Sequence, residues 1–186
     1  MNMLIAGLVL WTIAHMFKRL APGLRAGMTA KMGEGSKGVM ALVLLASIAL
    51  MVIGYRTAPV EFVYATPEWA RHANNALMLV AVALLGMGSS KGRARTWLRH
   101  PMLIGTVVWA GAHLMVNGDV ASVVLFGGIA IWAVASMLLI SLQDGKWQKP
   151  EPGPVAGDVK WLVISAVVFA VIAGIHIWIG PSPFGG

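Results

Sequence analysis

The sequence has no cysteine among its 186 residues. Disulfide bonds, thiolate metal ligands and a cysteine nucleophile are therefore excluded. Charged side chains are scarce as well: they make up 11% of the chain, whereas soluble domains contain about 25%. Hydrophobic residues reach 58%. A chain so poor in charge and so rich in apolar side chains is not a soluble domain, and it is predicted to reside in lipid.

Asp, Glu, Lys and Arg are absent from the middle of every long apolar stretch. Proton relays, cation-coupled carriers and voltage sensors place such groups inside the membrane, so these classes are disfavoured. No internal repeat is evident, which argues against an inverted-repeat transporter. The net charge of +7 does not indicate a nucleic-acid partner, because the cations lie in short gaps between apolar stretches and form no solvated basic face.

Six apolar stretches approach the roughly 20 residues that a transmembrane helix requires. They are Met3–Leu20, Gly38–Tyr55, Pro67–Met87, Pro101–Val116, Val120–Leu142 and Lys160–Pro181. The sequence thus predicts an all-α, polytopic transmembrane helical bundle of about six helices, forming a single domain over residues 1–186. Four residues are predicted as N-caps of these helices, two of them directly before a proline: Ser36, Thr66, His100 and Asp119.

The cations are distributed unevenly between the two sides of the membrane. The first, third and fifth loops hold 12 Lys and Arg residues, and the other loops hold only Arg56 and Arg71. The positive-inside rule therefore places those three loops in the cytoplasm and both termini on the non-cytoplasmic side. The predicted location is the cell inner membrane, with multiple passes and the lipid bilayer as the main partner.

Histidines are the titratable groups that remain at depth. With the first span entered from outside, His15 lies about 18 Å into the membrane, about 12 Å from the cytoplasmic edge of a core of about 30 Å. The fourth span places His113 about 18 Å from that edge, and the last span places His176 about 24 Å from it. His72 and His100 lie near helix starts, where an interfacial or capping role is expected.

Two neutral imidazoles from different helices, in an apolar bundle without carboxylates or thiolates, are what haem b requires of its axial ligands. His15, His113 and His176 are therefore candidate ligands. Trp109 lies one helical turn before His113 and shares its face. The alternative, which is commoner for a single histidine in a membrane, is a structural hydrogen bond to a neighbouring helix.

Several short motifs are spread over most of the chain. They are Leu24-Arg25 after His15, Gly54-Tyr55, Trp69-Ala70-Arg71-His72, Arg99-His100-Pro101, Trp109-Ala110-Gly111-Ala112-His113, Asn117-Gly118-Asp119 and His176-Ile177-Trp178-Ile179-Gly180. In this combination the chain resembles the NnrU family of bacterial membrane proteins. That resemblance implies a role in nitrogen-oxide metabolism during denitrification.

The same motifs are similar to those of 15-cis-zeta-carotene isomerase, a membrane enzyme that depends on haem b. This similarity implies that the two haem-iron ligands are His15 and His113, and Arg99 is expected to contact lipid phosphate or a haem propionate. Where the isomerase has a cysteine, this chain has Ala110. A thiolate-for-histidine switch is therefore impossible, although isomerisation or redox chemistry of a lipophilic substrate stays an expectation.

A rival resemblance is to isoprenylcysteine methyltransferase-like enzymes and related sterol reductases, which have an Arg-His-Pro at a cytoplasmic helix start. Those enzymes supply acidic and tyrosine residues after the next hairpin, whereas residues 141–149 here offer only Asp144. Neither S-adenosylmethionine nor NAD(P) is therefore expected. Three classes remain: a haem enzyme or electron-transfer protein with a redox partner, a methyltransferase-like or reductase-like enzyme, and a haem-free accessory factor.

Overall fold

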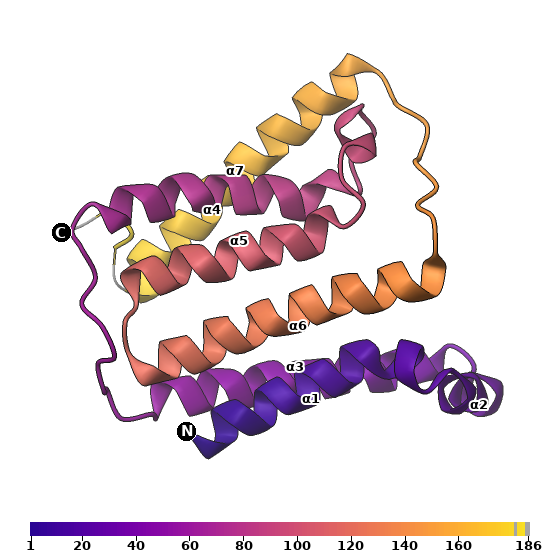
Figure 1. Cartoon of the computed structure of the whole chain (residues 1–186), viewed down its shortest axis with the longest axis horizontal. Coiled ribbons are helices and arrows are strands. Elements are labelled where there is room, and N and C mark those ends of the chain that lie inside the picture. The colour runs from indigo at the N-terminus through magenta and orange to yellow at the C-terminus, as the bar shows by residue number, and fades with distance from the viewer. Residues whose placement is uncertain (181, 185–186) are drawn as a thin grey trace. The chain divides into compact units, whose positions relative to one another are not determined.

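The computed structural model describes residues 1–180 and 182–184. Over these residues the chain forms seven α-helices and one short 3-10 turn, η1 (Figure 1). They are α1 (Asn2–Leu20), α2 (Pro22–Met32), α3 (Gly35–Arg56), α4 (Ala70–Met87), η1 (Ala94–Thr96), α5 (Pro101–Val116), α6 (Val120–Asp144) and α7 (Val155–Ile179). The predicted all-α architecture is confirmed.

Six of the seven helices cover the six predicted spans. Four of them, α1, α3, α6 and α7, are long and apolar enough to cross a membrane. The fifth, α5, is apolar but shorter, with 16 residues. The sixth, α4, begins with a polar turn that contains Arg71, His72, Asn74 and Asn75. The chain is therefore a membrane protein, and about six spans agrees with its helices.

Two of the predicted N-caps are wrong. α3 already begins at Gly35, so Ser36 lies inside the helix, where its hydroxyl donates to the Gly33 carbonyl at 2.8 Å. α4 begins at Ala70, three residues later than expected, because the residues after Thr66 form a separate turn in which the Ala70 amide bonds to the Pro67 carbonyl. α7 starts earlier than predicted, at Val155. The predicted end of the last span, Pro181, lies outside the described residues.

The chain divides into two compact units, and the prediction of a single domain stays a prediction. The first unit comprises Met1–Val63 and Asp119–Gly128. In it α1 packs against α3. A Cβ atom added at Gly7 would lie 2.8 Å from the Ser47 carbonyl oxygen, and one at Gly54 would overlap the Leu4 backbone. These two glycines therefore let the backbones of α1 and α3 approach closely.

The second unit comprises Tyr64–Gly118 and Ile129–Gly186. In it α4 packs against both α5 and α7. A Cβ atom added at Gly105 of α5 would lie 3.0 Å from the Ala81 carbonyl oxygen of α4. The Trp161 indole of α7 donates to the Ala83 carbonyl of α4 at 2.8 Å. α4 is thus the central helix of this unit.

The loops at one end of the second unit are joined by hydrogen bonds. The Gly153 amide, from the proline-rich linker before α7, bonds to the Gly92 carbonyl at 3.2 Å. Asp158 of α7 pairs with Arg93 at 3.2 Å and accepts the Ala94 amide at 2.9 Å. The third and fifth loops therefore meet, which is compatible with their predicted position on the same side of the membrane.

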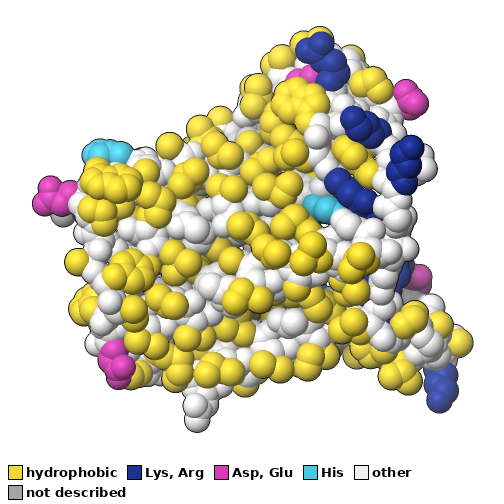
Figure 2. All heavy atoms as spheres, viewed as in Figure 1, with side chains coloured by type: hydrophobic (Ala, Val, Ile, Leu, Met, Phe, Trp, Pro, Cys, Tyr) yellow, Lys and Arg dark blue, Asp and Glu magenta, His cyan; other side chains and the backbone are white. Residues whose placement is uncertain are grey.

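Hydrophobic side chains cover most of the helical surface on the face shown in Figure 2, and Lys and Arg gather there over the α4–α5 loop and the start of α7. α7 is the clearest case, because only 6% of its apolar stretch is buried. Such faces are stable only against lipid or another apolar surface. This distribution agrees with the lipid bilayer as a partner.

Candidate functional site

His15 lies in the last two turns of α1, between the buried Ala14 and the cations that end the helix. Its Nδ1 lies 3.1 Å from the backbone oxygen of Trp11, one turn earlier. The imidazole and indole rings stack at a tilt, with centroids 4.0 Å apart and planes at 41°. Because a carbonyl oxygen can only accept, Nδ1 carries the proton and Nε2 carries the lone pair.

His113 has the same environment in α5. Its Nδ1 lies 3.1 Å from the Trp109 backbone oxygen. The two rings are 5.0 Å apart, with planes at 44°. The shared face of Trp109 and His113 that the sequence predicts is therefore confirmed. Here too the hydrogen bond makes Nε2 the nitrogen with the lone pair, which is the form of imidazole that binds a metal.

The two histidines belong to one repeated sequence segment, which the sequence analysis missed. Gly7-x-Val9-x-Trp11-x-x-Ala14-His15 and Gly105-x-Val107-x-Trp109-x-x-Ala112-His113 agree at five of nine positions. In each unit the glycine brings the backbone close to the neighbouring helix, and the alanine before the histidine is buried. Comparing the segments around the two candidate histidines would have found it. A nine-residue repeat is too short to indicate an inverted-repeat transporter.

His176, in α7, shares part of this arrangement. Its Nδ1 lies 2.9 Å from the Ile172 backbone oxygen, but no tryptophan precedes it by one turn. It belongs to the same unit as His113. His72, in the first turn of α4, and His176 are both exposed. The Nδ1 contact with a backbone oxygen makes His176 the stronger alternative ligand.

The Arg99-His100-Pro101 motif fastens the start of α5 to the end of α6. His100 is the N-cap residue and Pro101 stands at the first helical position, as the sequence predicts. The Arg99 guanidinium donates to the Gly145 carbonyl at 2.7 Å. Gly145 stands directly after α6 and has a φ of 64°, a conformation that glycine commonly supplies at the end of a helix. The Arg99 guanidinium therefore also lies at the negative end of the α6 helix dipole.

The His100 imidazole lies 2.9 Å from the Ser141 hydroxyl of α6 through its Nε2 atom. Burial lowers the pKa of His100, the neighbouring charge of Arg99 lowers it further, and Asp144 opposes both. His100 is therefore neutral at pH 7. Both side chains of the motif have a structural partner in α6 or directly after it, and the prediction that Arg99 contacts a phosphate or a propionate stays a prediction.

His15 belongs to the first unit and His113 to the second, so their pairing around one iron stays a prediction. Among the residues that the structure describes, no group of three or more His, Asp or Glu side chains is arranged to hold a metal ion. An axial pair needs only two imidazoles, because the porphyrin supplies the other four ligands. The donor chemistry of the two histidines, neutral with Nε2 as acceptor, therefore suits haem.

The sequence was compared with known families, curated proteins and solved structures. The sequence profile of one family, described as NnrU protein, matches residues 3–183. No curated protein and no solved structure matches the chain. The match covers both candidate histidines and the Arg99-His100-Pro101 motif.

Proposed function

Because the chain belongs to the NnrU protein family, we propose that it is a haem b protein of the cell inner membrane whose iron is held by His15 and His113. One observation carries the proposal: two nine-residue segments that agree at five positions occur in α1 and α5. Each copy ends in an imidazole whose Nδ1 is bonded to the backbone oxygen one turn earlier. Two chemically matched imidazoles support bis-histidine ligation.

Haem b, when bound in this way, supplies a one-electron redox couple. The residues around it contribute orientation. The Trp11 and Trp109 rings stack on the two imidazoles and limit their rotation. The hydrogen bond from Nδ1 makes the Nε2 atom of each histidine more basic. The proposed role is in nitrogen-oxide metabolism, or in haem-dependent isomerisation of a lipophilic substrate. Ala110 is fully buried and offers no ligand atom, so an iron switch to a thiolate has no part in it.

The test is the absorption spectrum of full-length protein purified in detergent after expression with haem supplied. Wild type should show a Soret band and the bands of low-spin haem. His15→Ala and His113→Ala should each lose the low-spin spectrum, either by losing haem or by leaving the iron high-spin. His72→Ala and His176→Ala are the matched controls and should keep it.

Two results would change this proposal. Loss of the low-spin spectrum in His176→Ala, with His15→Ala unaffected, would reassign the axial pair to His113 and His176. A wild-type protein without haem under iron-replete conditions would refute the cofactor and favour a haem-free accessory factor.

The methyltransferase-like alternative depends on the Arg99-His100-Pro101 motif. Both of its polar side chains already have hydrogen-bond partners at the end of α6: Ser141 in the helix and Gly145 directly after it. Calorimetric titration of the detergent-purified protein with S-adenosylmethionine and with NADPH should therefore give no saturable heat. Micromolar binding of either nucleotide would overturn this preference.

A further inference from the structure

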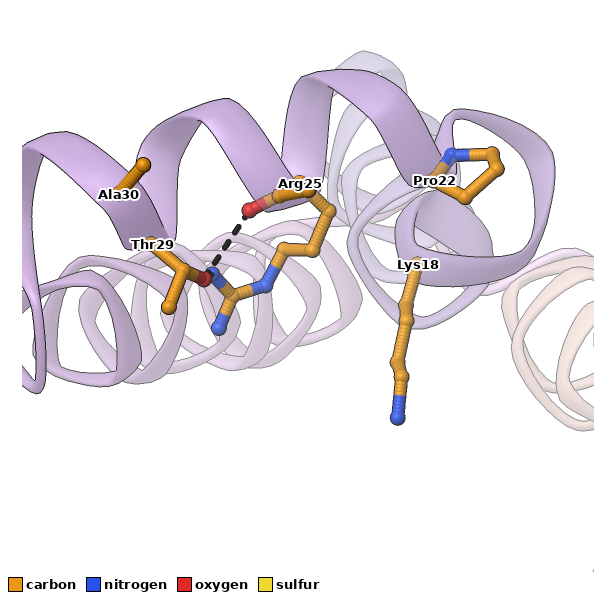
Figure 3. A pocket seen from close by; sticks show the side chains of 6 residues that line it. Lys18, Pro22, Arg25, Thr29 and Ala30 are labelled. Atoms are coloured by element: carbon orange, nitrogen blue, oxygen red, sulfur yellow. Dashed lines mark hydrogen bonds between the residues drawn. The ribbon is translucent and has the colours of Figure 1, made fainter.

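A pocket with two cationic side chains lies where α1 ends and α2 begins. It is lined by Lys18, Pro22, Arg25, Ala26, Thr29 and Ala30, with a volume of about 560 Å³. Five of these residues recur every three to four positions along α2, so one face of α2 forms the pocket wall. Figure 3 shows the Lys18 and Arg25 side chains extending to the same side of α2. The sequence analysis did not predict α2.

The Arg25 side chain is held in a fixed position by hydrogen bonds. Its Nη1 donates to the Thr29 hydroxyl at 2.8 Å and to the Ser36 hydroxyl of α3 at 3.0 Å. Ser36 is 1% exposed and is itself bonded to the Gly33 carbonyl. A guanidinium has five N–H donors in a rigid fork, so Nε and Nη2 retain donors for a further acceptor. Such a pre-positioned cation binds an anion with little loss of side-chain entropy.

No carboxylate compensates these charges nearby in the sequence. Glu34 is the one acidic residue among the first 60, and it pairs with Lys37 at 2.7 Å. Apart from Thr29, whose hydroxyl accepts from Arg25, the remaining lining of the pocket is apolar, from Pro22, Ala26 and Ala30. The pocket thus combines a positive potential with an apolar wall, which suits a ligand that has an anionic group and a hydrocarbon part.

The exposed side chains of the same segment indicate where it lies. Leu20 is 65% exposed and Leu24 is 68% exposed. Leu20 ends α1, which is long and apolar enough to cross the membrane, and Leu24 follows in α2. Exposed leucines beside Lys18, Arg25 and Lys31 are typical of a helix in the membrane interface. We propose that this pocket binds the phosphate of an anionic phospholipid, with Lys18 and Arg25 as its cationic contacts.

Native mass spectrometry of the full-length protein in detergent tests the site, with phosphatidylglycerol, phosphatidylcholine or inorganic phosphate added. Wild type should retain phosphatidylglycerol in preference to phosphatidylcholine and should not retain inorganic phosphate. Lys18→Gln should lower the occupancy about fivefold, from the worth of one cation near an anionic surface. Arg25→Lys keeps the charge but loses the fork, and it should weaken binding as well.

Lys31→Gln is the matched control, since it removes the same charge from α2 at a residue that does not line the pocket. It should bind like wild type. Equal losses in Lys18→Gln and Lys31→Gln would show a diffuse positive field and overturn the site. Equal retention of phosphatidylcholine, or retention of inorganic phosphate, would overturn the assignment to an anionic lipid. Because none of these measurements uses haem, their outcome is independent of the proposed function.

Discussion

Three histidines in three membrane helices have the same local geometry. In His15, His113 and His176 the Nδ1 atom faces the carbonyl oxygen of the residue four positions earlier, at 2.9 to 3.1 Å. A carbonyl oxygen inside a helix accepts one backbone amide with one of its two lone pairs. The helix backbone offers no other donor to the second lone pair. The contact therefore gives one ring nitrogen of each histidine a hydrogen-bond partner within its own helix, and it fixes the tautomer.

The tautomer of these three histidines is directly measurable. We expect ¹⁵N NMR of the labelled protein to show Nδ1 protonated and Nε2 unprotonated or metal-bound in His15, His113 and His176. Assignment follows from loss of one signal in each His→Ala variant. A protonated Nε2 in either His15 or His113 would contradict its role as an axial ligand.

Asp119 caps α6, as the sequence predicts. Its carboxylate accepts the Ser122 amide at 2.9 Å and the Ser122 hydroxyl at 2.6 Å, and the Tyr55 hydroxyl lies 2.9 Å from that same serine oxygen. Burial alone would raise the pKa of Asp119, but these hydrogen bonds outweigh it and hold the pKa below the ordinary value of 3.8. The charged carboxylate therefore stabilises the folded state.

Asp119→Ala should lower the free energy of unfolding by about 1 kcal/mol, the usual loss of an N-cap. Because the folded pKa is lowered, the stabilisation is fully present above pH 3.8 and is lost as the pH falls through the lower folded value. Thermal unfolding in detergent, followed by circular dichroism, measures both effects. Asp119→Asn keeps an acceptor and should reduce the acid dependence, and an unchanged acid dependence would contradict the assignment.

Among the helices, hydropathy in the sequence predicted the long apolar ones. It did not predict a polar helix or the residue at which some helices begin. The bounds of α5 are those expected, because His100-Pro101 marks its start and a turn sequence follows its end. α2 was missed because its 11 residues are mixed in polarity and none is buried. The errors at Ser36 and Thr66 have the same origin. A residue of a suitable type caps a helix only if it stands directly before the first helical residue, and neither of these two does.

Close helix contacts depend on glycine, and this gives a prediction for Gly54. A methyl group there would overlap the Leu4 backbone, so Gly54→Ala should lower the stability of the protein by about 1–3 kcal/mol through overpacking. Gly174→Ala is the control in another helix, because its added Cβ meets nothing within 4 Å. Its stability should be unchanged or slightly raised.

Tryptophan fluorescence or circular dichroism during heating distinguishes the two glycine variants, since a chain without cysteine gives no signal with thiol-reactive dyes. Equal melting temperatures for Gly54→Ala and wild type would mean that α1 and α3 separate easily, contrary to their close contact.

For the whole molecule, sequence reasoning gave the number of spans and the grouping of loops. The third and fifth loops, which the charge count assigns to one side, meet at Gly92 and Gly153. The second and fourth loops also meet, where the Val120 amide bonds to the Glu61 carbonyl at 2.8 Å. The depth of each histidine follows from its position along a helix, but the direction of its side chain around the axis does not. The axial pair was therefore not predictable from depth alone.

The absolute orientation stays a prediction from the 12 cations in loops one, three and five. Alkaline phosphatase fused after Gly186 should be active, and a fluorescent protein that folds only in the cytoplasm should be dark at the same position. Fusions in the loop at residues 88–93 should give the opposite pair of results. The reverse pattern at both positions would invert the topology.

The short length of α5 has a consequence for the surrounding lipid. Its 16 residues span about 24 Å at the usual helical rise, whereas the hydrocarbon layer is about 30 Å thick. Polar groups stand at both ends, Arg99 and His100 at one and Asn117 at the other, so the helix cannot be lengthened into the apolar layer. A helix this short is accommodated where the bilayer becomes thinner around it or where flanking side chains extend to the interface, and either adjustment costs energy that increases with acyl-chain length. The stability of this protein thus depends on the thickness of the membrane around it, and lipids with short chains should favour its folded state.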